Sequence, residues 1–86
     1  MRRLAHADWL QRTDGTLDCF LPYGISCILE PQREDGVVVW HCVVPVAGFC
    51  DRYGDDQTSF EAAAHVALRQ ARIAMNQIAR KQRGVA

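Results

Sequence analysis

The sequence predicts an α+β fold, a small antiparallel sheet of about three strands with one long C-terminal helix packed across it. Three observations support this prediction. Short runs of β-branched and aromatic residues separated by turn residues fill the first part of the chain. The hydrophobic period then changes from two residues to three or four. Residues 59–81 are alanine-rich and contain no glycine or proline, which favours helix. All 86 residues fit a single domain.

The first elements are short. Residues 5–12 are expected to form a short helix or a strand-like lead-in. The turn pair Asp14-Gly15 follows, and a β-prone stretch then runs from Leu17 to Leu21 before Pro22 ends it. Residues 25–30 alternate between an apolar and a polar side, the pattern of a half-buried strand.

The clearest strand covers residues 37–46 and pairs with residues 25–30 in a predicted hairpin, with residues 31–36 as a polar loop. Both sides of this strand are apolar, whereas one helix can cover only one of them. The second side must therefore be buried by residues 1–24 or by another chain, and we expect a homodimer. The predicted protein-binding face consists of Val37, Val39, His41 and Val43.

Residues 47–57 are predicted to form a loop, and the helix begins after this loop. Thr58 and Glu61 have the spacing of a capping box, with Thr58 as the N-cap. The predicted helix spans about 59–81. Its core-facing stripe follows three- and four-residue spacing and comprises Phe60, Ala64, Ala67, Leu68, Ala71, Met75 and Ile78.

Charge is balanced overall but uneven along the chain. Ten Lys and Arg residues match ten Asp and Glu residues, which excludes a globally basic nucleic-acid binder and an acidic disordered chain. From residue 59 onward one acid faces five bases, namely Arg69, Arg72, Arg80, Lys81 and Arg83. The helix dipole accounts for this bias. The alternative interpretation is a basic helix face for nucleic acid or an acidic partner, with at most weak, non-specific nucleic-acid binding expected.

The cysteines predict neither disulfides nor a metal site. They lie at positions 19, 27, 42 and 50, with eight-residue separations that do not suit a zinc knuckle. We expect reduced thiols that serve mainly as small buried apolar residues, with Cys50 the most exposed. Neither a secretion signal nor an apolar run of membrane-spanning length is present, so we expect a cytoplasmic protein that does not enter a membrane.

No catalytic motif is recognisable in the sequence. His41 and Cys42 are neighbours on a strand, so their side chains point to opposite sides and cannot form a base–nucleophile pair. The acids Asp51, Asp55 and Asp56 lack the spacing of a calcium loop. We therefore predict no catalytic residue, no metal ligand and no cofactor.

One family resemblance covers residues 25–75. The residues that carry it are Asp35-Gly36, Val37–Val44, Pro45, Gly48, Gly54-Asp55, Thr58 and Glu61-Ala62. This segment resembles the partial ribonuclease-H-like β-β-β-α domain of HicB-like antitoxins. The loop after Gly48 is longer than usual, residues 1–24 are additional, and the family's DNA-binding half has no counterpart within the 86 residues. The resemblance implies binding and neutralising a small partner protein.

A second similarity depends on residues 5–12. If they are helical, the order α-β-β-β-α is that of a double-stranded-RNA-binding domain, although its basic start of the last helix is missing here. The function that follows from both lines of reasoning is a non-enzymatic protein-interaction module. The alternative is a nucleic-acid-binding module that uses the basic helix face.

Overall fold

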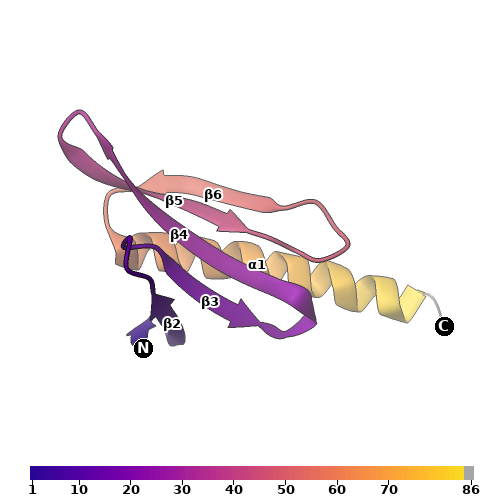
Figure 1. The fold of residues 1–86 in the computed structure, drawn as a ribbon. Coiled ribbons are helices and arrows are strands. Elements are labelled where there is room, and N and C mark those ends of the chain that lie inside the picture. The colour runs from indigo at the N-terminus through magenta and orange to yellow at the C-terminus, as the bar shows by residue number, and fades with distance from the viewer. Residues whose placement is uncertain (85–86) are drawn as a thin grey trace.

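The computed structural model describes residues 1–84, the last two by their backbone alone. Its six strands form one antiparallel sheet in which each strand pairs with its neighbours in sequence, and the helix lies across one face (Figure 1). In chain order the elements are β1 (Arg2–Leu4), β2 (Ala7–Gln11), β3 (Leu17–Leu21), the 3-10 turn η1 (Pro22–Gly24), β4 (Ile25–Glu34), β5 (Val37–Val44), β6 (Arg52–Gln57) and α1 (Phe60–Gly84).

The prediction of about three strands is therefore wrong, although the α+β class with one C-terminal helix is confirmed. Residues 5–12 are not helical: Ala5 and His6 form a turn with positive φ angles, and β2 follows directly. The order α-β-β-β-α is thus also wrong. Strands β1 and β2 have three and five residues, too few for a clear alternating pattern.

The predicted loop at residues 47–57 is wrong for strand β6, whose sequence, RYGDDQ, contains a glycine and two acids that are rare in strands. Packing explains why it is a strand. Gly54 pairs with Cys42 of β5, and a Cβ atom built on Gly54 would lie only 2.2 Å from Cγ1 of Val66 in α1. Glycine is needed here because the helix passes so close to the sheet.

The predicted β4–β5 hairpin is confirmed, but its connection is much shorter than expected. Residues 31–34 belong to β4, with Pro31 paired to Trp40 and Gln32 to Val39. Only Asp35 and Gly36 form the turn, both with positive φ, as two-residue hairpins require. The hairpin tip extends past the start of α1 (Figure 1).

Helix α1 begins one residue later than the capping box suggests. Oγ of Ser59 accepts a hydrogen bond from the Ala62 backbone N–H at 3.1 Å, so Ser59 rather than Thr58 is the N-cap. The side chains most deeply buried on the helix are small. They are Ala63, Ala64, Ala67, Ala71 and Ala74, joined by Ile78, whereas Phe60, Leu68 and Met75 are only partly buried.

Alanines bring the helix backbone close to the sheet, where two thiols meet it. The Cys42 thiol donates to the carbonyl oxygen of Ala63 at 3.4 Å, and the Cys27 thiol donates to that of Ala67 at 3.7 Å. These cysteines share the core with Leu17, Leu29 and their neighbours on the helix-facing side of the sheet. The prediction that cysteines act as buried small residues is confirmed for Cys19, Cys27 and Cys42, while Cys50 is exposed.

The N-terminal hairpin extends the sheet and curls toward the helix. Trp9 is fully buried, and its indole N–H donates to the Leu4 carbonyl at 3.1 Å. The Arg2 guanidinium lies 4.2 Å from the ring centre of Phe60 at the start of α1. Residues 1–24 therefore continue the sheet, and the side opposite the helix stays uncovered (Figure 1).

Candidate functional site: the open sheet face and the basic helix face

The uncovered side of the sheet holds the protein-binding face expected from the sequence. Val37, Val39, His41 and Val43 alternate with Cys42 and Val44, which are buried against the helix. Val37 is 53% exposed, and Val39, His41 and Val43 are partly buried. The sequence pattern thus predicted correctly that these β5 residues share one side of the strand, and the structure places that side away from the helix.

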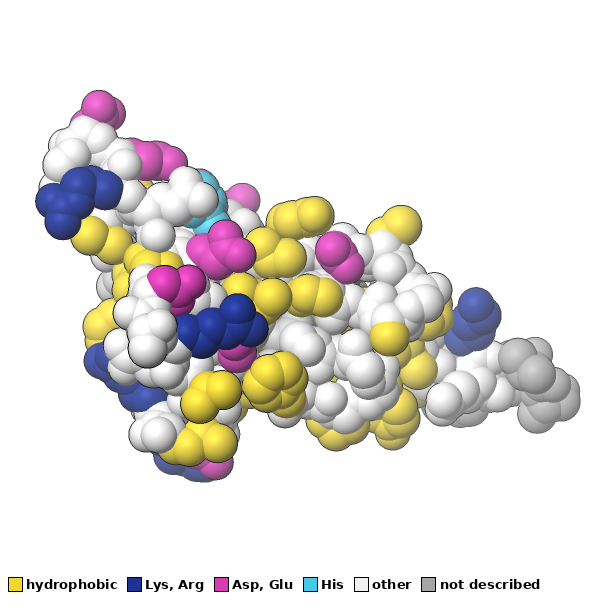
Figure 2. All heavy atoms as spheres, in the orientation of Figure 1, with side chains coloured by type: hydrophobic (Ala, Val, Ile, Leu, Met, Phe, Trp, Pro, Cys, Tyr) yellow, Lys and Arg dark blue, Asp and Glu magenta, His cyan; other side chains and the backbone are white. Residues whose placement is uncertain are grey.

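Three other strands add large apolar side chains that the sequence did not assign to this face. Phe20 of β3 is 69% exposed, Tyr53 of β6 is 67% exposed and Leu10 of β2 is 46% exposed. Leu10 pairs with Asp18, and Tyr53 pairs with Val43, so the register places them on the same side as the β5 residues. We call this surface, from Leu10 to Tyr53 across the sheet, the open face. Figure 2 shows it with α1 behind, its hydrophobic side chains interspersed with acidic ones.

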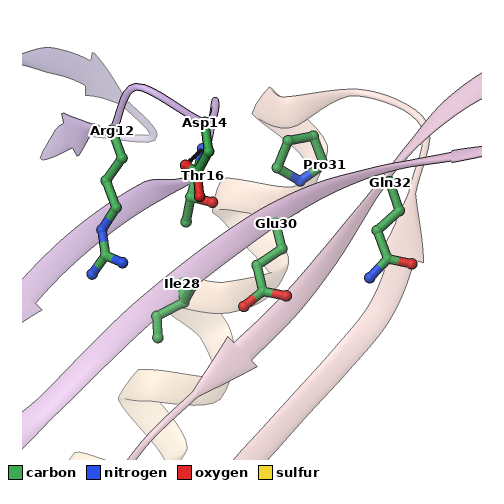
Figure 3. A pocket seen from close by; sticks show the side chains of 7 residues that line it. All are labelled: Arg12, Asp14, Thr16, Ile28, Glu30, Pro31 and Gln32. Atoms are coloured by element: carbon green, nitrogen blue, oxygen red, sulfur yellow. Dashed lines mark hydrogen bonds between the residues drawn. The ribbon is translucent and has the colours of Figure 1, made fainter.

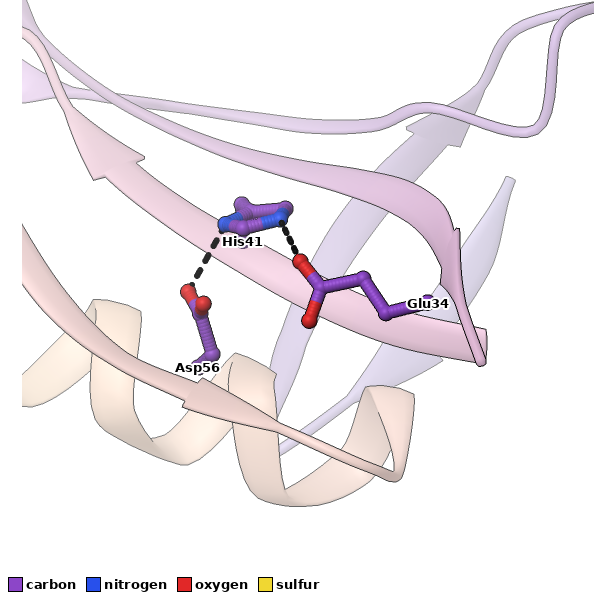
Figure 4. Close-up of side chains that lie close together, drawn as sticks. All are labelled: Glu34, His41 and Asp56. Atoms are coloured by element: carbon purple, nitrogen blue, oxygen red, sulfur yellow. Dashed lines mark ion pairs between the residues drawn. The ribbon is translucent and has the colours of Figure 1, made fainter. Parts of the chain in front are cut away.

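At one end of the open face, His41 lies between two carboxylates (Figure 4). Its Nδ1 is 2.8 Å from Oδ1 of Asp56, and its Nε2 is 3.6 Å from Oε1 of Glu34. This cluster links the end of β4, the middle of β5 and the end of β6. Sequence reasoning missed it because its members are far apart in the chain and Asp56 was assigned to a loop.

These three groups could in principle hold a metal ion, since their ligand atoms lie within 4.8 Å of one another. The two carboxylates, however, approach opposite nitrogens of the same ring, and one ion cannot bind both nitrogens. An ion on Nε2 would have Glu34 as its second ligand, while Asp56 would only orient the ring. Two ligands are fewer than zinc or calcium sites use. The cluster is better described as a set of polar side-chain contacts between three strands.

A polar pocket of about 470 Å³ lies where the β2–β3 turn meets β4 (Figure 3). Arg12, Asp14 and Thr16 line it from the turn, and Glu30 and Gln32 line it from β4. The Thr16 backbone N–H donates to Oδ1 of Asp14 at 2.9 Å and lowers the pKa of that carboxyl. The lining groups carry both signs of charge, so the pocket does not select a ligand by charge.

Beside this pocket, the buried Asp18 accepts a hydrogen bond from Nε of Arg12. Its other carboxylate oxygen, Oδ1, has no hydrogen-bond partner among the described residues. Leaving one oxygen of a buried carboxylate unpaired has a cost in free energy. The Arg12 pair offsets part of that cost and anchors the β2–β3 turn.

The five predicted basic residues do not form one patch. Arg69 and Arg72 line a pocket together with His6 and His65, near the β1–β2 turn. Arg80 is exposed further along the helix. Nζ of Lys81 lies 4.9 Å from the ring centre of Phe49. The side chain of Arg83 lies outside the described part of the chain.

The thiols differ in reactivity because of burial. Burial raises the pKa of Cys27 to about 12 and that of Cys42 to about 11, and it also raises the pKa of Cys19. A thiol is nucleophilic only as the thiolate, so these three are poor nucleophiles at neutral pH. Cys42 also lies on the opposite side of β5 from His41, as expected.

Within residues 1–84, no helix has the length and apolar character needed to cross a membrane. Comparison of the chain with protein-family models, with curated proteins and with solved structures found no match.

Proposed function

We propose that this chain is a non-enzymatic protein-interaction module, that its open face is the binding surface, and that the occupant is a second copy of the chain. The observation that carries the proposal is a sheet with one side covered by α1 and the other side carrying exposed Phe20, Val37 and Tyr53. Exposed apolar patches of this kind mark interaction sites in soluble proteins.

The dimensions of the molecule suit a face-to-face dimer. Its extents are 52 × 25 × 19 Å, so the broadest projection can supply the roughly 800 Å² per partner that a standard interface buries. Aromatic residues are enriched at interfaces, and Phe20 and Tyr53 stand on β3 and β6, on either side of the central strands. In a two-fold dimer the same surface meets itself, so the apolar residues of each copy cover those of the other.

At long range, electrostatics does not oppose this assembly. The formal net charge of the chain is zero, so two copies do not repel each other at long range. The three thiols of the core are buried, and Cys42 lies on the opposite side of β5 from His41, so it cannot act as a nucleophile beside that imidazole. These groups are therefore better suited to contact with another protein chain than to acid–base or nucleophilic chemistry.

The resemblance to HicB-like antitoxins supports the same class of function. Strands β4, β5 and β6 followed by α1 have the strand-strand-strand-helix order that the resemblance implies. A small partner protein bound to the open face would bury the exposed apolar side chains, as a second copy of the chain would. Self-association is the simpler case, and it can be tested with the purified chain alone.

Sedimentation velocity on matched lysine variants tests the proposal. Phe20→Lys places a charge in the open face, whereas Ile73→Lys places the same charge at an exposed apolar position on α1. We expect a dimer at tens of micromolar for the wild type and for Ile73→Lys, and a monomer for Phe20→Lys. A wild-type monomer at high micromolar concentration, or a dimer that Phe20→Lys leaves intact, would contradict the proposal.

A further inference from the structure

A pocket separate from the open face lies where the β1–β2 turn meets the middle of α1. Its volume is about 260 Å³, and it is lined by Ala5, His6, His65, Leu68, Arg69 and Arg72. On α1, Leu68 and Arg69 lie three and four positions after His65, and Arg72 lies four and three positions after them, so the four residues share one side of the helix. None of these residues belongs to the open face, so ligand binding in this pocket does not require the dimer proposed above.

Every polar side chain that lines this pocket is basic, and none is acidic. Three other arginines are paired: Arg3 with Asp8, Arg12 with Asp18, and Arg52 with Gln70. The four basic side chains around the pocket are exposed, and none of them has an ion-pair or hydrogen-bond partner among residues 1–84. The guanidinium charges of Arg69 and Arg72 repel each other, and a bound anion would relieve that repulsion.

The turn that brings His6 to the pocket is strained. Ala5 and His6 have φ angles of 52° and 64°, a region that two-residue hairpin turns usually fill with asparagine, aspartate or glycine. Alanine does not favour this conformation, and histidine adopts it only occasionally. Nη2 of Arg3 donates to the His6 carbonyl at 3.3 Å and helps to hold the turn. Backbone strain of this kind concentrates at functional sites.

We propose that this pocket binds a phosphate monoester group. The volume is below the roughly 300–1,000 Å³ of pockets that enclose whole small molecules, so it suits one ionic group with the rest of the ligand outside. A monoester carries nearly two negative charges at neutral pH, which matches two arginines better than the single charge of a diester does. The planar guanidinium groups of Arg69 and Arg72 can each donate two hydrogen bonds to phosphate oxygens. Leu68 and Ala5 provide apolar contact beside the charged groups.

Calorimetric titration with inorganic phosphate tests the site. Arg69→Ala/Arg72→Ala should weaken binding by about tenfold or more, because charge-assisted hydrogen bonds are lost. Arg80→Ala is the matched control, since Arg80 is an exposed arginine of the same helix that does not line the pocket. We expect wild-type affinity for Arg80→Ala. A wild-type chain that does not bind phosphate, or equal losses in both variants, would overturn the proposal.

The source of the phosphate group is distinguished by three further probes. Adenosine monophosphate and an oligonucleotide with a 5′-phosphate should bind, whereas the same oligonucleotide without a terminal phosphate should bind at least about tenfold more weakly. Binding of the adenosine monophosphate alone assigns the site to small phosphate esters. Equal binding of both oligonucleotides would show recognition of the diester backbone and would refute a monoester site.

A second pair of variants separates binding from folding. His6→Gly relieves the strained turn, so it should raise the Tm while it weakens phosphate binding. Asp35→Gly makes a matched change in the β4–β5 turn, where aspartate already suits the positive φ, so it should change the Tm little and leave phosphate binding unaffected. If His6→Gly binds phosphate as tightly as the wild type, His6 is not part of the site and the proposal fails.

Discussion

Replacing Gly54 by alanine tests how closely α1 packs on the sheet. The new Cβ atom would lie 2.2 Å from Cγ1 of Val66 and 3.2 Å from Cβ of Cys42. The first distance is well below any van der Waals contact, so either the Val66 side chain rotates or the helix moves away from β6. Such overpacking costs about 1–3 kcal/mol of folding free energy.

An opposing effect comes from the unfolded chain. Gly54 does not have a positive φ, so alanine can adopt its backbone conformation and the substitution alone would stabilise by about 0.4–1 kcal/mol. The expected net effect is a loss of about 1–2 kcal/mol in the free energy of unfolding. Urea denaturation followed by circular dichroism measures it, with the slope unchanged if only the native packing is altered.

The cause can be isolated with a double-mutant cycle. Val66→Ala removes the atom that the new methyl group would strike, so Gly54→Ala should cost less in that background than in the wild type. We expect a coupling energy of about 1 kcal/mol between the two sites. Additive effects, or a Gly54→Ala variant at least as stable as the wild type, would refute the packing of β6 against α1 described here.

Three further predictions follow from burial. Leu68 is only partly buried, so Leu68→Ala should lower the free energy of unfolding by less than the roughly 2–5 kcal/mol of a fully buried leucine, whereas Ala71→Leu should lower it by about 1–3 kcal/mol through overpacking. Thermal denaturation compares the two variants. A larger loss for Leu68→Ala than for Ala71→Leu would mean that the helix is rotated. In the native chain at pH 8, a thiol reagent should modify Cys50 alone, as peptide mass mapping would show, and fast labelling of a second cysteine would contradict the burial. In the folded state Cys27 and Cys42 keep their protons above the ordinary thiol pKa of 9.0. The stability that they contribute should therefore be fully present below pH 9 and decline as the pH rises toward 11 and 12. Denaturant titrations between pH 8 and 11 test this, and a Cys27→Ala variant with an equally steep decline would count against it.

Parts of the fold were predictable because their sequences favour one structure strongly. The valine-rich β5 has high β-propensity along its whole length, and the alanine-rich run after residue 59 excludes glycine and proline until Gly84. Strand β6 was not predictable from local sequence. Its glycine and acids disfavour a strand, and pairing with β5 together with tertiary contacts to α1, among them the Arg52–Gln70 hydrogen bond, stabilises it there.

The open face was predictable only in part, and the clusters were not. Alternation along β5 placed Val37, Val39, His41 and Val43 on one side, because strand side chains alternate strictly. Phe20 and Tyr53 lie on the same face because of the register between the strands, and local sequence does not specify that register. The pocket at Arg69 and Arg72 likewise needs the β1–β2 turn, whose residues do not resemble a standard turn sequence.

The central claim is that the open face meets the open face of a second copy, and an isotope-filtered nuclear Overhauser experiment tests it directly. One copy would carry ¹³C-labelled valine methyl groups and the other would be unlabelled. The proposed dimer predicts intermolecular contacts from the methyl groups of Val37, Val39 and Val43 to the rings of Phe20 and Tyr53. Intermolecular contacts that involve only α1 or only the edge strand β6 would contradict it. So would the absence of intermolecular contacts at high micromolar concentration.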